Sequence, residues 1–303
     1  HVPAWYFNGG LGQIRPELLT AERDRERWLD NQLRAVKANV EEALDSASLF
    51  YPTIEMFSLY GTHFMDILFG GQVRWYEEQF WSEPVDYAVA DIAAPDLDGI
   101  PLVQEAIELA AWVREKTAGR FLISMPDVGC PLNIAINIFG EGFLLELALD
   151  PASAKRALII IGAATRRVHE MLIEAVGQET LRCHNAYYVY TPHDVAGLSI
   201  CATQLVSPDH FSEAIADADD ACLPSSYHGL LQHLCGHSSQ HIAELARRRT
   251  VRGVQLNDAA ANDFEAYYNG LREDQAVYVI PTEQMPLDKI LSISGGRRVV
   301  ILA

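Results

Sequence analysis

The stretch "GLLQHLCGHSSQHIAELARRRTVRGVQL" (Gly229 to Leu256) decides the fold class. It opens with the apolar run GLLQHLC, continues with the helix-forming segment SSQHIAELARRR, and ends with a second apolar run, VRGVQL. Two short apolar runs that flank a helical segment through short connections are typical of a strand, a helix and a second, parallel strand. The stretch therefore predicts an α/β protein with a parallel sheet.

The same alternation extends through the rest of the chain. Further strands are predicted at residues 2–7, 49–57, 120–125, 186–190, 197–201, 276–280 and 297–303, and helices at 16–47, 101–117, 151–176, 259–270 and 286–291. The helix 151–176 has the strongest boundaries, because Asp150 can cap it, Pro151 suits its first turn and Gly177 can end it. The segment VRWYEEQFW (73–81) is expected to form an edge hairpin.

About eight strands in such a series favour a closed (β/α)₈ barrel of the TIM type. An open, doubly wound sheet is the alternative. The sequence shows no internal repeat and no linker, so one barrel domain is expected over residues 1–303, with native residues missing at one or both ends.

Composition limits the classes of partner. The net charge of −18 argues against nucleic acid and against an anionic membrane surface. The five cysteines form no disulfide framework, which favours reduced thiols in a cytoplasmic protein. No apolar run is long enough for a membrane span, and a homodimer is among the expected assemblies.

Chemistry is expected where strands end, because a βα barrel forms its functional face from the carboxyl ends of its strands. His233 and Cys235 end one strand, and their spacing of two places both side chains on the same face. A buried cysteine beside a hydrogen-bonded histidine would give the same pattern without a metal. The other polar residues expected at this face are Asn8, Cys130, Cys201, Asp258 and Glu283.

The positions of four further polar residues predict where their side chains lie. His63 lies in a short helix and is expected to line the substrate pocket, whereas Asp66 on that helix is expected to be a surface charge. His237 and His241 lie four residues apart on one helix face, where they are expected to form a solvated first turn.

Four segments, in the right order, resemble the uroporphyrinogen decarboxylase-like superfamily between about Pro52 and Asp258. They are FGGQVRWYEEQFWSEPV (69–85), GCPLNIAINIFGEGFLLELALDPASAKRAL (129–158), LVSPDHFSEAI (205–215) and LLQHLCG (230–236). The resemblance implies a (β/α)₈ barrel. It also implies one of two chemistries, which are the decarboxylation of a porphyrinogen without a cofactor and methyl transfer at a zinc–thiolate site.

The sequence is nearer to the methyltransferase branch. True decarboxylases carry an arginine after the first strand and an aspartate in a Phe-Ser-Asp segment. The corresponding segments here, FNGGLGQ (7–13) and FSLYG (57–61), contain neither residue. The His-x-Cys pair of the methyltransferases is matched by His233 and Cys235. Their later cysteine ligand is missing, because no cysteine follows Cys235.

The third ligand is left open by the sequence. Asp258, Glu283 and Cys201 are candidates, and so is a cysteine beyond Ala303 if the chain is truncated. The resemblance thus implies a zinc-dependent transfer of a methyl group to a thiol from a methylated corrinoid protein or a small methylated donor. In that reading His233 and Cys235 are catalytic, and Asn8, His63, Cys130 and Cys201 contact the small-molecule substrate. The alternatives are decarboxylation of a porphyrinogen or a smaller acid, and a barrel that binds without catalysis.

Overall fold

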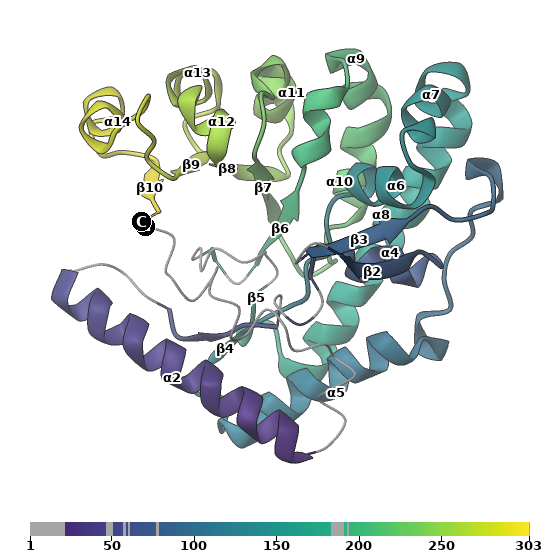
Figure 1. Cartoon of the computed structure of the whole chain (residues 1–303). Helices are drawn as coiled ribbons and strands as arrows, with labels where there is room; N and C mark the ends of the chain where they lie inside the picture. The colour runs from purple at the N-terminus through teal and green to yellow at the C-terminus, as the bar shows by residue number, and fades with distance from the viewer. Residues whose placement is uncertain are drawn as a thin grey trace.

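The computed structural model describes residues 22–46, 51–56, 59, 61–76, 79–182, 191–192 and 194–302. The strands predicted at residues 2–7 and 186–190 lie outside these ranges. Within them the chain forms two parallel sheets, one antiparallel hairpin and a set of helices that lie around the outside of the strands (Figure 1). The mixed α/β fold with parallel strands is confirmed.

The larger sheet has five parallel strands in the order β10-β9-β8-β7-β6. Its strands are β6 (Val195–Ser199), β7 (Gly229–Leu234), β8 (Val251–Leu256), β9 (Ala276–Val279) and β10 (Val299–Ile301). The smaller sheet has the order β1-β4-β5, with β1 (Thr53–Ile54), β4 (Leu122–Ser124) and β5 (Leu181–Arg182). Among the described residues no pairing joins β5 to β6 or β10 to β1, so barrel closure stays a prediction.

Helices lie between most of the strands along the chain, and α2 precedes β1. They are α2 (Glu22–Ser46), α4 (Phe64–Leu68), α5 (Pro101–Lys116), α6 (Pro131–Phe139), α7 (Gly142–Leu149), α8 (Pro151–Val176), α9 (Pro208–His210), α10 (Ala216–Ala221), α11 (Ile242–Arg247), α12 (Asp258–Asn262), α13 (Phe264–Gly270) and α14 (Leu287–Ser294). Short 3₁₀ or π turns precede several of them, including η2 (Gly61–His63), η5 (Cys201–Leu205), η6 (Phe211–Ile215) and η7 (Ser239–His241).

Helix α8 forms where its sequence signals place it. The Asp150 carboxylate accepts a hydrogen bond from the Ser153 amide at 3.1 Å, which caps the helix, and Gly177 ends it at a φ of +84°. The predicted hairpin also forms, as β2 (Gln72–Tyr76) paired antiparallel with β3 (Gln79–Glu83). The helix predicted at 259–270 is broken into α12 and α13 at Asp263.

The strands of the larger sheet have two differently packed faces. Leu230 and Leu234 of β7 belong to the main core, together with Val254 and Leu256 of β8. On the opposite face Leu231 packs with Val195 and Tyr278 in a separate small cluster. Because side chains alternate along a strand, His233 shares the face of Leu231. This face therefore carries polar side chains above a small apolar layer.

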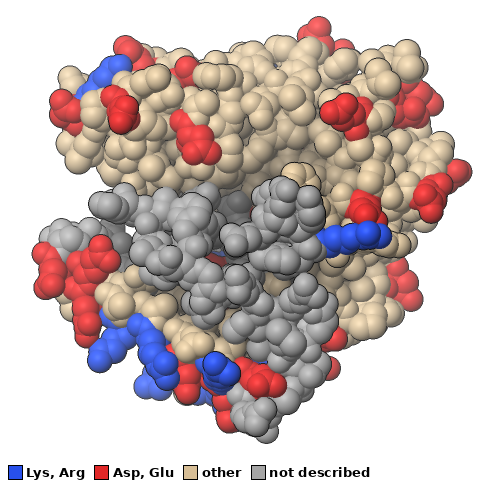
Figure 2. Space-filling view, viewed as in Figure 1, with Lys and Arg blue, Asp and Glu red and all other residues tan. Residues whose placement is uncertain are grey.

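The described surface is mainly acidic or uncharged in Figure 2, and the basic side chains shown there gather mostly at the lower edge, where α2 lies. Among the described helices none is both long and apolar enough to cross a membrane alone. Only α6 and α7 taken together, with a bend of 115°, reach the required length and hydropathy.

Candidate functional site

The end of β7 brings His233 and Cys235 together. His233 is the last inward residue of the strand, only 5% exposed, and Cys235 follows directly after the strand. His233 Nε2 lies 2.9 Å from Cys235 Sγ. The spacing of two residues thus places an imidazole nitrogen and a sulfur side by side, as the sequence predicts.

Cys201 joins this pair from the neighbouring strand. The register pairs Ser199 of β6 with His233 of β7, so the residues two positions further on also lie next to each other. Cys201 begins η5 just past the end of β6, and its Sγ lies 3.2 Å from Cys235 Sγ. The ligand atoms of Cys201, His233 and Cys235 all lie within 4.8 Å of one another. We call these three residues the sulfur–imidazole cluster.

Several contacts fix the backbone around Cys201. Asn133 of α6 accepts a hydrogen bond from the Ala202 amide and donates one to the Ser199 carbonyl, both at 2.9 Å. The Ile200 amide donates to the His233 carbonyl at 2.9 Å. His241 Nε2 hydrogen-bonds the Thr203 carbonyl at 2.9 Å. The segment that carries Cys201 is therefore held from three sides.

The end of the exposed Gln204 side chain lies against the backbone of Gly236. A Cβ atom added at Gly236 would lie 1.9 Å from the Gln204 side-chain oxygen, so a larger residue there would displace this flexible side chain.

The pKa values of the two cysteines of the cluster shift in opposite directions, because the Cys201 thiol donates a hydrogen bond to the Cys235 sulfur. A hydrogen bond from Cys201, followed by the one from His233, lowers the pKa of Cys235 well below its ordinary value. The same sulfur–sulfur bond, together with burial, raises the pKa of Cys201. Burial lowers the pKa of His233, but the hydrogen bond and negative charge of Cys235 outweigh it and raise the pKa overall. Cys235 is therefore the thiolate and Cys201 the thiol of the pair.

The other predicted residues lie in different surroundings. Cys130 is fully buried and caps α6, with its Sγ 3.4 Å from the Asn133 amide. Burial raises the pKa of its thiol, so it remains protonated. Glu283 is exposed in the turn between β9 and α14, away from the cluster. Asn8 lies outside the described residues.

Asp258 lies at the edge of the site. It opens α12 at a φ of +47°, and its carboxylate accepts a hydrogen bond from Asn257 at 3.2 Å. Burial and the negative charge of Cys235 raise the pKa of Asp258. The charge of Cys235 thus affects the pKa of Asp258, but Asp258 is not one of the three residues whose ligand atoms lie within 4.8 Å of one another.

His63 belongs to a second polar group, which contacts α6 one turn further along at Asn137. Its Nδ1 lies 2.6 Å from the Asp66 carboxylate, and the Asn137 amide nitrogen lies 3.4 Å from the same atom. Asp66 is fully buried, so the prediction of a surface charge was wrong. Asp66 lies on α4, where most residues are buried, and His63 and Asn137 contact its buried carboxylate.

The expectation of a solvated turn at His237 and His241 was wrong for one of the two. His237 is exposed, with 76% of its side chain accessible, but His241 is only 1% exposed. The His241 ring packs against Phe211 with ring centres 4.6 Å apart. Sequence reasoning missed this contact, and it also missed Asn133, because both depend on partners far away in the sequence.

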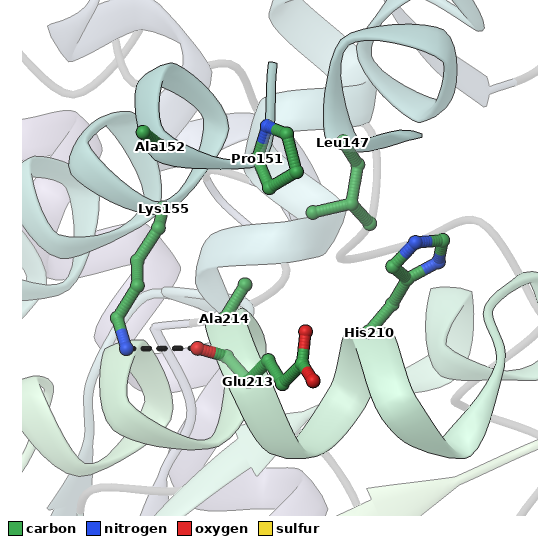
Figure 3. Close-up of a pocket in the computed structure, with 7 residues that line it drawn as sticks. All are labelled: Leu147, Pro151, Ala152, Lys155, His210, Glu213 and Ala214. Carbon is green, nitrogen blue, oxygen red and sulfur yellow. Dashed lines mark hydrogen bonds between the residues drawn. The ribbon is translucent and has the colours of Figure 1, made fainter. Parts of the chain in front are cut away.

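A shallow pocket of about 220 Å³ lies elsewhere, between α7, the start of α8 and the α9–η6 segment (Figure 3). Leu147, Pro151 and Ala214 line it, and Lys155 at its edge donates hydrogen bonds to the Glu213 carbonyl and the Asp217 carboxylate. It is smaller than the usual ligand pocket. None of its lining residues belongs to the sulfur–imidazole cluster.

The fold and the site together define an α/β protein with parallel sheets and a Cys/His/Cys group that can hold a metal ion. No family model and no curated protein matches the sequence. A solved methyltransferase from Methanosarcina mazei has a similar structure, with a TM-score of 0.57 and 14% sequence identity over 82% of this chain and 73% of that one. At this identity the likeness concerns the fold.

Proposed function

We propose that the protein is a methyltransferase that moves a methyl group to a small thiol at a zinc ion held by Cys201, His233 and Cys235. The observation that carries the proposal is the convergence of two sulfurs and one imidazole nitrogen within 4.8 Å at the ends of two adjacent parallel strands. This is the edge of the fold where a barrel enzyme places its chemistry. The fold that the chain shares with a methyltransferase supports the same reading.

The donor set suits zinc. Thiolate and imidazole are the ligands that zinc prefers, and two sulfurs bound to one tetrahedral zinc ion lie about 3.8 Å apart, given a Zn–S bond of about 2.3 Å. The two sulfurs lie 3.2 Å apart, in hydrogen-bond contact, so they would have to separate by about 0.6 Å to bind one ion. All three ligand atoms already lie within 4.8 Å of one another. Catalytic zinc sites have three protein ligands and one open position, which is the number the cluster offers.

When bound, zinc lowers the pKa of a coordinated thiol and holds it as a thiolate near neutral pH. Cys201, His233 and Cys235 would hold the ion, and the chemistry it would supply is the activation of the acceptor thiol, whose proton would go to solvent. The acceptor sulfur would form a bond to the methyl carbon as the carbon–donor bond breaks, and the donor would keep the electron pair. The donor is a methylated corrinoid protein or a small methylated compound.

The remaining predicted residues have supporting places in this proposal. Asp258 is proposed to contribute negative charge beside the cluster. Its carboxylate is also the proposed source of a fourth ligand, or of a ligand that replaces one of the three. His63 at the end of η2 and Cys130 at the cap of α6 are proposed to contribute to the substrate side of the site, as is Asn8. A homodimer stays a prediction.

The experiment is a measurement of zinc content in protein purified with zinc present. Wild-type protein should contain close to one zinc per chain, and Cys235→Ala should lose it. Cys222→Ala is the matched control, because Cys222 is a buried cysteine outside the cluster. Zinc-free wild-type protein under these conditions would overturn the proposal. If the wild-type protein does contain zinc, the next measurement is methyl transfer to a thiol from free methylcobalamin by the zinc-loaded protein.

A further inference from the structure

Cys201 and Cys235 bring their sulfur atoms into direct contact at the ends of two adjacent strands. The Cys201 thiol donates a hydrogen bond to Cys235 Sγ at 3.2 Å. A disulfide bond is about 2.05 Å long, so the two sulfurs need to approach by about 1.2 Å to form one. The Ile200 amide donates to the His233 carbonyl at 2.9 Å, so the pairing of the two strands continues up to the residue before Cys201. Paired strands lie about 4.8 Å apart, which is a spacing that a disulfide can span.

Hydrogen bonds hold the backbone on both sides of the sulfur pair. The Cys235 carbonyl accepts a hydrogen bond from the Ala260 amide at 3.3 Å. On the other strand, the Ala202 amide donates to the Asn133 side-chain oxygen at 2.9 Å. The fold therefore keeps the two sulfurs together although they are 34 residues apart. Because the loop between them is already closed, a covalent bond costs little further chain entropy.

The pair is also open to a small reagent. Cys201 and Cys235 are partly exposed, whereas Cys130 and Cys222 are fully buried, and Cys183 lies outside the described residues. Oxidation selects accessible sulfurs, and it ends in a disulfide where a second thiol lies beside the first. Among the described cysteines, Cys201 and Cys235 are the pair that meets both conditions.

We propose that Cys201 and Cys235 form a site of reversible oxidation, at which a hydroperoxide converts the two thiols into a disulfide. The Cys235 sulfur attacks the peroxide, so that an S–O bond forms and the O–O bond breaks. The departing oxygen takes up the proton that Cys235 gives up, and leaves as an alcohol or as water. The Cys201 sulfur then attacks the Cys235 sulfur, and the hydroxyl group leaves as water with the Cys201 proton. The two sulfurs together lose two electrons, which the peroxide gains.

The disulfide would also control the proposed metal site. Zinc binds thiolates, so oxidation of both cysteines would leave His233 as the one remaining ligand of the sulfur–imidazole cluster. This part of the inference rests on the proposed function, whereas disulfide formation does not. Two sulfurs on one zinc ion lie about 3.8 Å apart, so zinc binding and oxidation move the sulfurs in opposite directions. The metal and the oxidant thus compete for the same two atoms.

The first experiment treats zinc-free protein with hydrogen peroxide and maps its cysteines by mass spectrometry without reduction. Two of the five thiols should be lost, and the peptides of Cys201 and Cys235 should be found joined. Dithiothreitol should restore both thiols. Wild-type protein that forms no disulfide would overturn the inference, and so would a disulfide in which Cys130, Cys183 or Cys222 replaces either member of the pair.

Two variants show which sulfur does what. In Cys201→Ala the reaction should stop at a sulfenic acid on Cys235, which dimedone traps. Cys222→Ala is the matched control, because Cys222 is buried outside the cluster, and this variant should form the same disulfide as wild type. A dimedone adduct in Cys201→Ala on any cysteine other than Cys235 would contradict the assigned order of the two steps.

A last measurement separates this inference from the proposed function. Zinc-loaded protein is treated with hydrogen peroxide, and a chromophoric chelator follows the release of zinc. One zinc ion should be released for each Cys201–Cys235 disulfide formed. Retention of zinc while this disulfide forms would overturn the link between oxidation and the metal. Protein that binds no zinc but still forms the disulfide would reject the proposed function and support the oxidation site. Protein that binds zinc but forms no disulfide when zinc-free would do the reverse.

Discussion

Cys201 Sγ lies 3.2 Å from Cys235 Sγ, although the two residues are 34 positions apart in the chain. The contact exists because β6 and β7 are adjacent parallel strands whose register aligns Ser199 with His233. Each cysteine then lies two residues after its member of this aligned pair. The pair converts a two-residue motif at the end of one strand into a three-ligand cluster shared by two strands.

Cys201, rather than a carboxylate, is expected to be the third metal ligand. Cys201→Ala should lower zinc affinity at least 100-fold, because it removes one of three protein ligands. Asp258→Asn should cause a smaller loss, since Asp258 contributes charge near the cluster. Glu283→Gln should have no effect, because Glu283 is exposed and outside the cluster. Competition with a chelator measures all three, and a larger loss in Asp258→Asn than in Cys201→Ala would reject the assignment.

Cys235 of the metal-free protein is expected to react with iodoacetamide at mildly acidic pH. The hydrogen bonds from Cys201 and His233 lower the pKa of Cys235, so the reactive thiolate persists below pH 7. His233→Gln removes one of these stabilising partners and should slow alkylation at pH 6 by roughly tenfold. Peptide mapping by mass spectrometry follows the rate at each cysteine.

Cys222 provides the internal control in the same experiment. It is fully buried, and burial raises the pKa of its thiol, so it should stay unlabelled until the protein unfolds. An inflection for Cys235 near the ordinary thiol pKa of about 8.5 would contradict the prediction.

The sequence predicts a contact in this site more readily when the two residues are close together along the chain. His233 and Cys235 share a strand end, so the period of two residues is enough to place them on one face. Cys201 is recognisable as a residue at a strand end, but its choice over Asp258 and Glu283 requires the register between β6 and β7. The pairing of Gln255 with His233 likewise depends on the register between β7 and β8, which the run VRGVQL does not reveal.

Contacts between residues far apart in the sequence also explain why Asp66 and His241 were wrongly predicted to be exposed. Asp66 and His241 lie on short helices whose polar spacing indicates a solvated surface. In the folded chain α6 covers the first through Asn137, and Phe211 covers the second. The core helix α8 is predicted almost to the residue, since its cap, its first proline and its terminal glycine are all local signals. Barrel closure depends on the longest-range pairings and stays a prediction.

His169 is expected to make the protein less stable in acid. It is fully buried on α8, and burial lowers its pKa from 6.5 to about 4. The unfolded chain therefore binds a proton between pH 6.5 and about 4 that the folded chain does not. The associated stability is complete above pH 6.5 and is lost as the pH falls towards 4, by at most about 3 kcal/mol.

Urea unfolding at a series of pH values measures this loss. His169→Gln should flatten the curve over that window, while His228→Gln, at a histidine with 74% of its side chain exposed, should leave its slope unchanged. Equal slopes in wild type and His169→Gln would show that other groups cause the acid sensitivity.

Asn133 is expected to support metal binding without touching the metal. Its side chain joins α6 to the Ser199 carbonyl and the Ala202 amide, on either side of the segment that leads to Cys201. Asn133→Ala removes both bonds and leaves the Cys201 backbone free to shift, so zinc affinity should fall by roughly tenfold. The chelator competition used for the ligand variants measures this change.

Asn137→Ala is the matched control for Asn133→Ala. Asn137 lies one helical turn further along α6, where it contacts His63 instead of the cysteine segment. Its loss should disturb the His63–Asp66 pair and leave zinc affinity within about twofold of wild type. If both variants lowered zinc affinity equally, α6 would act through its general stability. If only Asn133→Ala lowered zinc affinity, the Asn133 side-chain amide would be the group that holds Cys201 beside Cys235.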